Sequence, residues 1–101
     1  MNTNALGTAL VTGASSGIGA VYADRLAHRG YDLVLVARSE DKLDALAKHI
    51  TSATGRKVRI VAADLTLDAD LHRVEQVIGD TPDLTLLVNN AGVGATAPLL
   101  Q

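Results

Sequence analysis

Apolar residues along the chain occur in two patterns: short continuous runs, and longer stretches in which they recur at helical spacing. The short runs are rich in Val and Leu, which is typical of parallel strands buried on both faces of a sheet. Strands are predicted over Ala9–Val11, Leu33–Ala37, Val58–Ala63 and Leu84–Val88, and helices over Ile18–Arg29, Glu40–Ala53 and Leu67–Ile78. This alternation of strand and helix predicts an α/β domain.

Residues at the predicted helix boundaries support these limits. Gly30 and Gly55 stand where the first two helices should end, because glycine readily adopts the left-handed conformation found there. Ser39 stands where the second helix should begin, and its hydroxyl can accept a hydrogen bond from a free amide of the first turn. Thr66 is the expected cap of the third helix.

The right-handed connections of parallel strands determine how these elements are arranged. The first three strands step outward in one direction, with the first two helices on one face of the sheet. The third helix crosses the other face and brings the fourth strand beside the first. The predicted fold is Rossmann-like, a doubly wound parallel sheet of order 3-2-1-4 with three helices. Ligands of such sheets bind where the strand order reverses, here between strands one and four.

A glycine-rich turn, Thr12-Gly13-Ala14-Ser15-Ser16-Gly17-Ile18-Gly19, connects the first strand to the first helix. Gly13 allows a sharp turn, Gly17 allows the backbone to approach an anion, and Gly19 allows the helix to pack closely. The helix N-terminus adds unpaired amides and a partial positive charge. Strand, turn and helix together predict a pyrophosphate site. The alternative is a chance glycine-rich turn, since glycine spacing alone is a weak signal.

A second motif, Asn89-Asn90-Ala91-Gly92, follows the fourth apolar run. The two motifs, in this order and spacing, resemble the classical short-chain dehydrogenase/reductase family from about Ala9 to Gly92. The resemblance implies an oxidoreductase that transfers a hydride between a nicotinamide cofactor and a carbonyl or alcohol substrate. Residues 1–101 would be the N-terminal part of its single NAD(P)-binding domain, and a homo-oligomer is expected. The extended epimerase and dehydratase group is a further alternative, but its glycine spacing is usually one residue shorter.

The candidate cofactor-binding residues come from the two motifs and from two other strand ends. They are Gly13, Ser15, Ser16, Gly17, Ile18, Gly19, Arg38, Ser39, Asp64, Leu65, Asn90, Ala91 and Gly92. The resemblance implies that Asp64 accepts a hydrogen bond from the adenine amino group and that the Leu65 backbone amide lies on the adenine ring. The alternative is that Asp64 is an ordinary turn residue. Asn90 and Gly92 are expected to line the cofactor, and Asn89 to be mainly structural. Ser15 and Ser16 can donate to phosphates.

Arg38 follows the second strand, where the cofactor ribose is recognised. An acidic residue there would bind the 2′-hydroxyl of NAD(H), whereas a guanidinium can hold a 2′-phosphate with two donors. Ser39 can add a hydroxyl donor. Some family members have a basic residue at the position of Ser16, and this chain does not. The intact protein is therefore predicted to prefer NADP(H) to NAD(H), unless Arg38 is only a solvated residue at a helix start.

Composition narrows the functional classes further. The net charge of −2 gives no reason to expect nucleic acid or a membrane surface as a partner. No apolar run is long enough to span a bilayer, and no secretory signal is visible. The absence of cysteine is consistent with a cytoplasmic protein. His28, His49 and His72 are isolated on helical stretches, so no metal site is predicted.

The tyrosine–lysine pair on which the family's chemistry depends is absent from these residues. Tyr22 is followed four positions later by Leu26, and Tyr31 by Leu35. No Tyr-x-x-x-Lys motif occurs, and no catalytic residue is predicted in this chain.

Charge along the outer strands predicts which of them is a true edge. Lys57 and Arg59 mark the third strand as an edge, whereas Leu84–Val88 carries no charge and is expected to be an interior strand. The sequence therefore resembles the first half of a doubly wound domain, truncated after strand four. The alternatives are a half-domain that pairs with another chain, such as a non-catalytic dinucleotide-binding module, and a self-sufficient small fold.

We predict that residues 1–101 made alone have no dehydrogenase activity and do not form a stable monomer. A few hundred Å² of uncovered apolar surface, at about 25 cal/mol per Å², amounts to several kcal/mol, comparable to the stability of a small domain. Sedimentation and thermal melting of the purified chain test this prediction. A monodisperse monomer with a sharp, high melting transition would contradict it.

Overall fold

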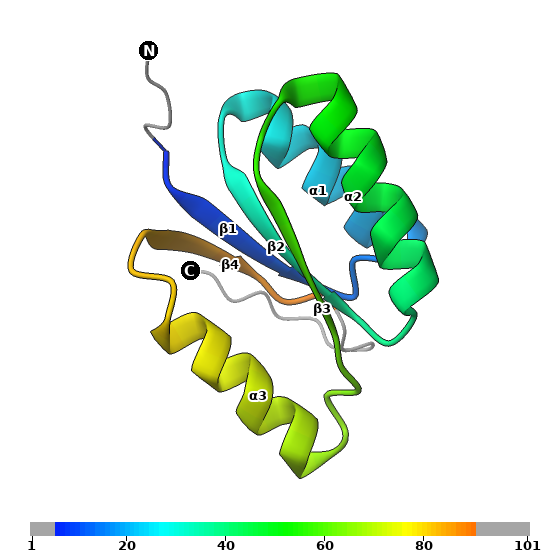
Figure 1. Ribbon diagram of the computed structural model, residues 1–101, viewed down its shortest axis with the longest axis vertical. Helices are drawn as coiled ribbons and strands as arrows, with labels where there is room; N and C mark the ends of the chain where they lie inside the picture. Colours follow the sequence, from blue (N-terminus) through cyan, green and yellow to red (C-terminus); the bar gives the residue numbers. More distant parts are fainter. Residues whose placement is uncertain (1–5, 91–101) are drawn as a thin grey trace.

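Four strands and three helices alternate in the computed structural model, which describes residues 6–90 (Figure 1). The elements are β1 (Thr8–Thr12), α1 (Gly17–Arg29), β2 (Asp32–Ala37), α2 (Glu40–Thr54), β3 (Val58–Ala62), α3 (Asp68–Gly79) and β4 (Leu84–Val88). Each lies where the apolar pattern predicts it, with bounds that differ by no more than one residue.

The strands form one parallel sheet of order β3-β2-β1-β4, and this confirms the predicted topology. Helices α1 and α2 cover one face of the sheet and α3 covers the other (Figure 1). The described part of the chain is therefore a three-layer α/β structure in which β1 and β2 are the inner strands.

Successive residues of β2 supply both layers of the core, which explains its unbroken apolar run. Leu33 and Leu35 pack with the cluster under α1 and α2, which contains Leu43 and Ile50. Val34 and Val36 point the other way, into the cluster under α3. A strand buried on both faces has no position at which a polar side chain can remain solvated.

The predicted helix ends are confirmed at Gly30 and Gly55, which have φ of +111° and +75°. Ser39 caps α2, its Oγ accepting from the Lys42 amide at 3.4 Å. The prediction for Thr66 is wrong: the residue before α3 is Leu67, and it has no side-chain cap. Thr66 lies one residue before the cap position, and its backbone amide and hydroxyl are directed back to the carboxylate of Asp64, to which they donate at 3.0 and 2.6 Å.

The two outer strands differ in charge as predicted, with one adjustment. Arg59 lies in β3, whereas Lys57 lies just before it, where its backbone amide donates to the carboxylate of Asp32 at 3.1 Å. Within residues 6–90, β4 pairs with β1 alone, and the Leu87 side chain is 40% exposed. Whether β4 is an interior strand of a larger sheet stays a prediction.

Helix α1 begins in close contact with the turn that precedes it. Gly13 has a φ of +65°, which only glycine adopts easily, and it bends the chain out of β1. A Cβ atom on Gly19 would collide with the backbone carbonyl of Gly13. Gly19 therefore sets how closely α1 packs on the end of β1.

We predict that Gly19→Ala destabilises the protein and that Gly79→Ala does not. A collision with backbone cannot be relieved by a side-chain rotation, so Gly19→Ala should lower the free energy of unfolding by roughly 1–3 kcal/mol. A Cβ on Gly79, at the end of α3, would meet no atom within 4 Å, and alanine should be neutral or stabilising there. Chemical denaturation of both variants provides the measurement. Equal effects of the two substitutions would contradict the role given to Gly19.

Candidate functional site

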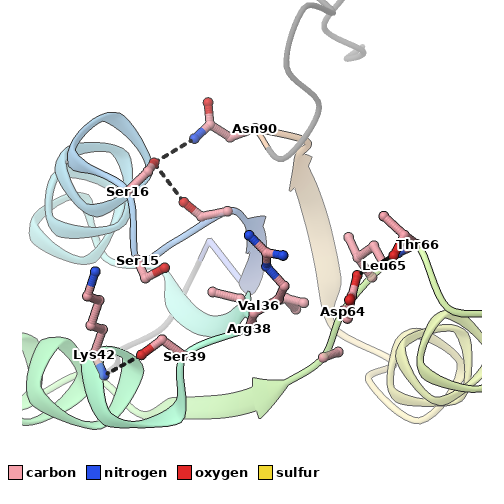
Figure 2. Close-up of a pocket in the computed structure, with 13 residues that line it drawn as sticks. Ser15, Ser16, Val36, Arg38, Ser39, Lys42, Asp64, Leu65, Thr66 and Asn90 are labelled. Atoms are coloured by element: carbon pink, nitrogen blue, oxygen red, sulfur yellow. Dashed lines mark hydrogen bonds between the residues drawn. The ribbon is translucent and has the colours of Figure 1, made fainter.

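A cavity of about 560 Å³ lies at the carboxyl ends of the strands (Figure 2). Its wall comes from four segments that are far apart in sequence: the β1–α1 turn, the β2–α2 junction, the residues after β3, and one residue after β4. The lining residues are Gly13, Ser15, Ser16, Val36, Ala37, Arg38, Ser39, Lys42, Ala63, Asp64, Leu65, Thr66 and Asn90. Parallel strands bring these segments together because all their carboxyl ends meet at one edge of the sheet.

Most of the candidate residues that lie within the described part of the chain line this cavity. They are Gly13, Ser15, Ser16, Arg38, Ser39, Asp64, Leu65 and Asn90. Gly17, Ile18 and Gly19 do not, because they form the first turn of α1, where the Ile18 side chain is 66% exposed. Ala91 and Gly92 fall outside the described residues. The individual cofactor roles of all these residues stay predictions.

The glycine-rich turn is held closed by the hydroxyl of Ser16. This hydroxyl donates to the carbonyl of Gly13 at 2.9 Å and accepts from the amide of Gly19 at 3.1 Å, so it caps α1. The Ser16 proton is thus used within the turn. Ser15, by contrast, makes no hydrogen bond with residues 6–90 through its hydroxyl, so its proton is available to a ligand in the cavity.

The carboxyl ends of β1 and β4 are joined by the hydroxyl of Thr12, to which the sequence assigned no role. It donates to the side-chain carbonyl of Asn89 at 2.9 Å and accepts from the backbone amide of Asn90 at 2.8 Å. This contact connects the two strand ends, and the mainly structural role that the resemblance implies for Asn89 stays a prediction. It leaves the Asn90 side chain on the cavity, where its amide lies 3.4 Å from the Ser16 oxygen.

Asp64 is held as an ionised acceptor beside the cavity. Hydrogen bonds from the hydroxyl and then the backbone amide of Thr66 lower its pKa below the usual value, and the charge of Arg38 contributes in the same direction. An ionised carboxylate can accept hydrogen bonds but cannot donate one. Asp64 therefore has the character that recognition of an amino group requires.

Helix α3 fixes the segment that carries Asp64, through two residues that sequence reasoning missed. The Asp64 backbone amide donates to the Asp70 carboxylate at 2.8 Å. Arg73 donates to the Ala62 carbonyl at 2.7 Å and to Asp70 at 3.3 Å. The amide of Asp64 and then Arg73 lower the pKa of Asp70.

Positive charge at the cavity comes from Arg38 and from Lys42. The sequence analysis singled out Arg38 but not Lys42, which lies one turn into α2. Neither cation forms an ion pair with an acidic side chain within residues 6–90. Lys42 lies three residues after the cap Ser39, on the first turn of the same helix.

Comparison with known proteins agrees with this geometry. The family model for short chain dehydrogenases matches residues 7–101. The chain belongs to this family. Its curated relatives include a very-long-chain 3-oxoacyl-CoA reductase of Pyrenophora tritici-repentis, 42% identical over 95 residues, and the 17-beta-hydroxysteroid dehydrogenase type 3 of Danio rerio, 42% identical over 87 residues. These matches cover 90% and 84% of this chain but only 28% and 27% of the two relatives.

Solved short chain dehydrogenase structures share the fold closely. The bulky-bulky ketone specific alcohol dehydrogenase from Comamonas testosteroni is 46% identical with a TM-score of 0.85, over 94% of this chain and 38% of that one. A short-chain dehydrogenase from Sphingobium yanoikuyae in complex with NADPH is 50% identical with a TM-score of 0.84, over 91% of this chain and 36% of that one. The chain therefore spans little more than a third of these structures.

Residues 6–90 contain neither a metal-binding cluster nor a membrane-spanning helix. No three side chains of the metal-binding types gather there into a group that could hold an ion. No helix of this part is long and apolar enough to cross a membrane. The predictions of a cytoplasmic location, of a protein without metal and of no nucleic-acid partner stay predictions.

We predict that Asp64 and Asp70 both titrate below the usual aspartate pKa of about 3.9. Because folding lowers both pKa values, each carboxylate stabilises the fold above its unfolded pKa, and this contribution is lost as the pH falls through the lowered folded value. Carboxyl carbon NMR shifts followed through acidic pH give both midpoints.

The variant Thr66→Ala separates the two carboxylates. It removes the largest cause of the shift at Asp64, so the pKa of Asp64 should rise while that of Asp70 changes little. Thr81→Ala is the matched control, because the Thr81 hydroxyl bonds the Val77 carbonyl at the other end of α3. A pKa of Asp64 that does not respond to Thr66→Ala would contradict this explanation.

Proposed function

We propose that the protein carrying this chain is an NADP(H)-dependent oxidoreductase that transfers a hydride between nicotinamide and a carbonyl or alcohol substrate. In this proposal the present chain supplies the cofactor-binding half. The observation that carries it is the cavity itself, which gathers the glycine-rich turn, Arg38, Asp64 and Asn90 from four separate segments. The relatives are named as reductases and dehydrogenases, which supports the reaction class.

The groups around the cavity fit the parts of a dinucleotide. The Ser15 hydroxyl lines the cavity, and α1 begins directly after the lining residue Ser16; a hydroxyl donor beside the positive end of a helix dipole suits a pyrophosphate. The ionised Asp64 suits an adenine amino group. Asn90, beside the junction of β1 and β4, suits a ribose.

Selectivity for the phosphorylated cofactor is proposed from Arg38 and Ser39. A guanidinium without an acidic partner in residues 6–90 can bind a 2′-phosphate through two parallel hydrogen bonds. The Sphingobium neighbour was solved with NADPH, and a metagenomic short-chain oxidoreductase at 37% identity was solved with NADP. These neighbours support the phosphorylated cofactor for this chain.

The cofactor, when bound, supplies or accepts the hydride. The residues of this chain bind and orient it, since they contain no Tyr-x-x-x-Lys pair for proton transfer. The relatives act on substrates as different as an oxoacyl-CoA, a hydroxysteroid and a bulky ketone, by their names. The substrate is therefore proposed only as a carbonyl compound or its alcohol.

We predict that Arg38→Asp removes the preference for NADP(H) in the intact protein. Loss of a charged, two-donor phosphate contact should cost roughly 1.5–3 kcal/mol, or about ten- to a hundredfold in relative affinity. Dissociation constants for NADPH and NADH, measured separately, give the ratio. Arg25→Asp on the exposed face of α1 makes the same charge change outside the cavity lining and serves as the control. An unchanged ratio in Arg38→Asp would refute the proposed selectivity.

A further inference from the structure

Lys42 lines the candidate cofactor cavity together with Arg38 and Ser39. It is the third residue of α2, one turn beyond the cap. Figure 2 shows its ammonium and the Arg38 guanidinium both turned toward the glycine-rich turn that carries Ser15. Two cationic groups from one short segment therefore face the same hollow.

The first turn of α2 separates its charges between two sides of the molecule. Glu40 lines a different hollow, at the outer edge of β3, with Arg59 and Arg73. Lys42 points into the cofactor cavity, and Asp41 lines neither hollow. The Lys42 charge is therefore not cancelled inside the cavity by the acidic residue that begins the helix.

The stability of α2 gives no reason for a cation at this position. A positive charge in the first turn is opposed by the helix dipole. Further along the same helix Lys48 pairs with Asp44 at 3.1 Å, whereas Lys42 forms no ion pair within residues 6–90. An anionic ligand in the cavity would supply the missing partner.

We propose that Lys42 is the second cation of the 2′-phosphate subsite, and that it determines selectivity for NADP(H) together with Arg38. This inference rests on the proposed function. A phosphate monoester carries between about 1.5 and 2 negative charges at neutral pH, more than Arg38 alone neutralises. Arg38 provides a rigid pair of donors, and Lys42 provides a flexible point charge.

Ser39 lines the same cavity and completes this subsite. Its Oγ accepts from the Lys42 backbone amide at 3.4 Å, which leaves the hydroxyl proton available for a phosphate oxygen. NAD(H) has a neutral hydroxyl in place of the phosphate. Lys42 should therefore strengthen binding of the phosphorylated cofactor alone.

The test measures equilibrium binding to the full-length protein that carries this chain. Calorimetry gives dissociation constants for NADPH and NADH, and for adenosine 2′,5′-bisphosphate and 5′-AMP as fragments without nicotinamide. Lys42→Gln should weaken NADPH and the bisphosphate about five- to twentyfold and change NADH and 5′-AMP less than about twofold. The difference in affinity between the original protein and Lys42→Gln should become smaller at high salt, because salt screens an exposed charge.

Three further variants control this experiment. Lys48→Gln removes the same charge from the same helix outside the cavity and should leave all four constants unchanged. Lys42→Arg retains the charge and should retain the ratio of NADPH to NADH affinity. Arg38→Ala tests the proposed function itself, because that proposal assigns the preference for NADPH over NADH to Arg38.

The outcomes separate the two proposals. If Arg38→Ala lowers the NADPH to NADH preference and Lys42→Gln does not, the inference about Lys42 is wrong and the proposed function stands. An equal loss of affinity for NADPH and NADH in Lys42→Gln would also overturn the inference about Lys42, since that result indicates general damage to the site. A parent protein without preference for NADPH would overturn both proposals together.

Discussion

Parallel pairing of the strands is the constraint on which the site depends. Each strand of a parallel sheet runs the same way, so every segment that leaves a strand emerges at one edge. All five residues of β1 are buried, and its backbone is paired on one side with β2 and on the other with β4. The polar side chains that line the cavity, among them those of Ser16, Arg38 and Asp64, therefore lie beyond the strand ends.

The elements and their order could be predicted because each rests on local properties of the sequence. Doubly buried strands require unbroken apolar runs, and helices ended by Gly30 and Gly55 require a residue that tolerates positive φ. Thr66 misled because a hydroxyl before an acidic stretch resembles a helix cap. Thr66 instead turns back to Asp64 and leaves the cap position to Leu67, and this depends on the shape of the turn after β3.

Lys42 and Asp70 could not be found by the same means. An exposed lysine in the first turn of a helix has the local pattern of any solvated charge. Its place on the cavity depends on where α2 begins relative to the end of β2. Asp70 reaches back to the Asp64 amide, which lies on the far side of the turn between β3 and α3. Such contacts follow from tertiary structure, and periodicity carries no information about them.

The two helical layers lie on opposite faces of the sheet, yet both are connected to the cavity wall. The starts of α1 and α2 supply Ser16 and Lys42 from one layer, and the contact between Asp70 and Asp64 connects the wall to α3 in the other. A ligand that spans the cavity would thus bridge both layers and bind only the native arrangement. Ligand concentration then contributes to the folding equilibrium by mass action, by about 2.7 kcal/mol at a hundred times its dissociation constant. In such a protein, binding of the cofactor also raises the free energy of unfolding.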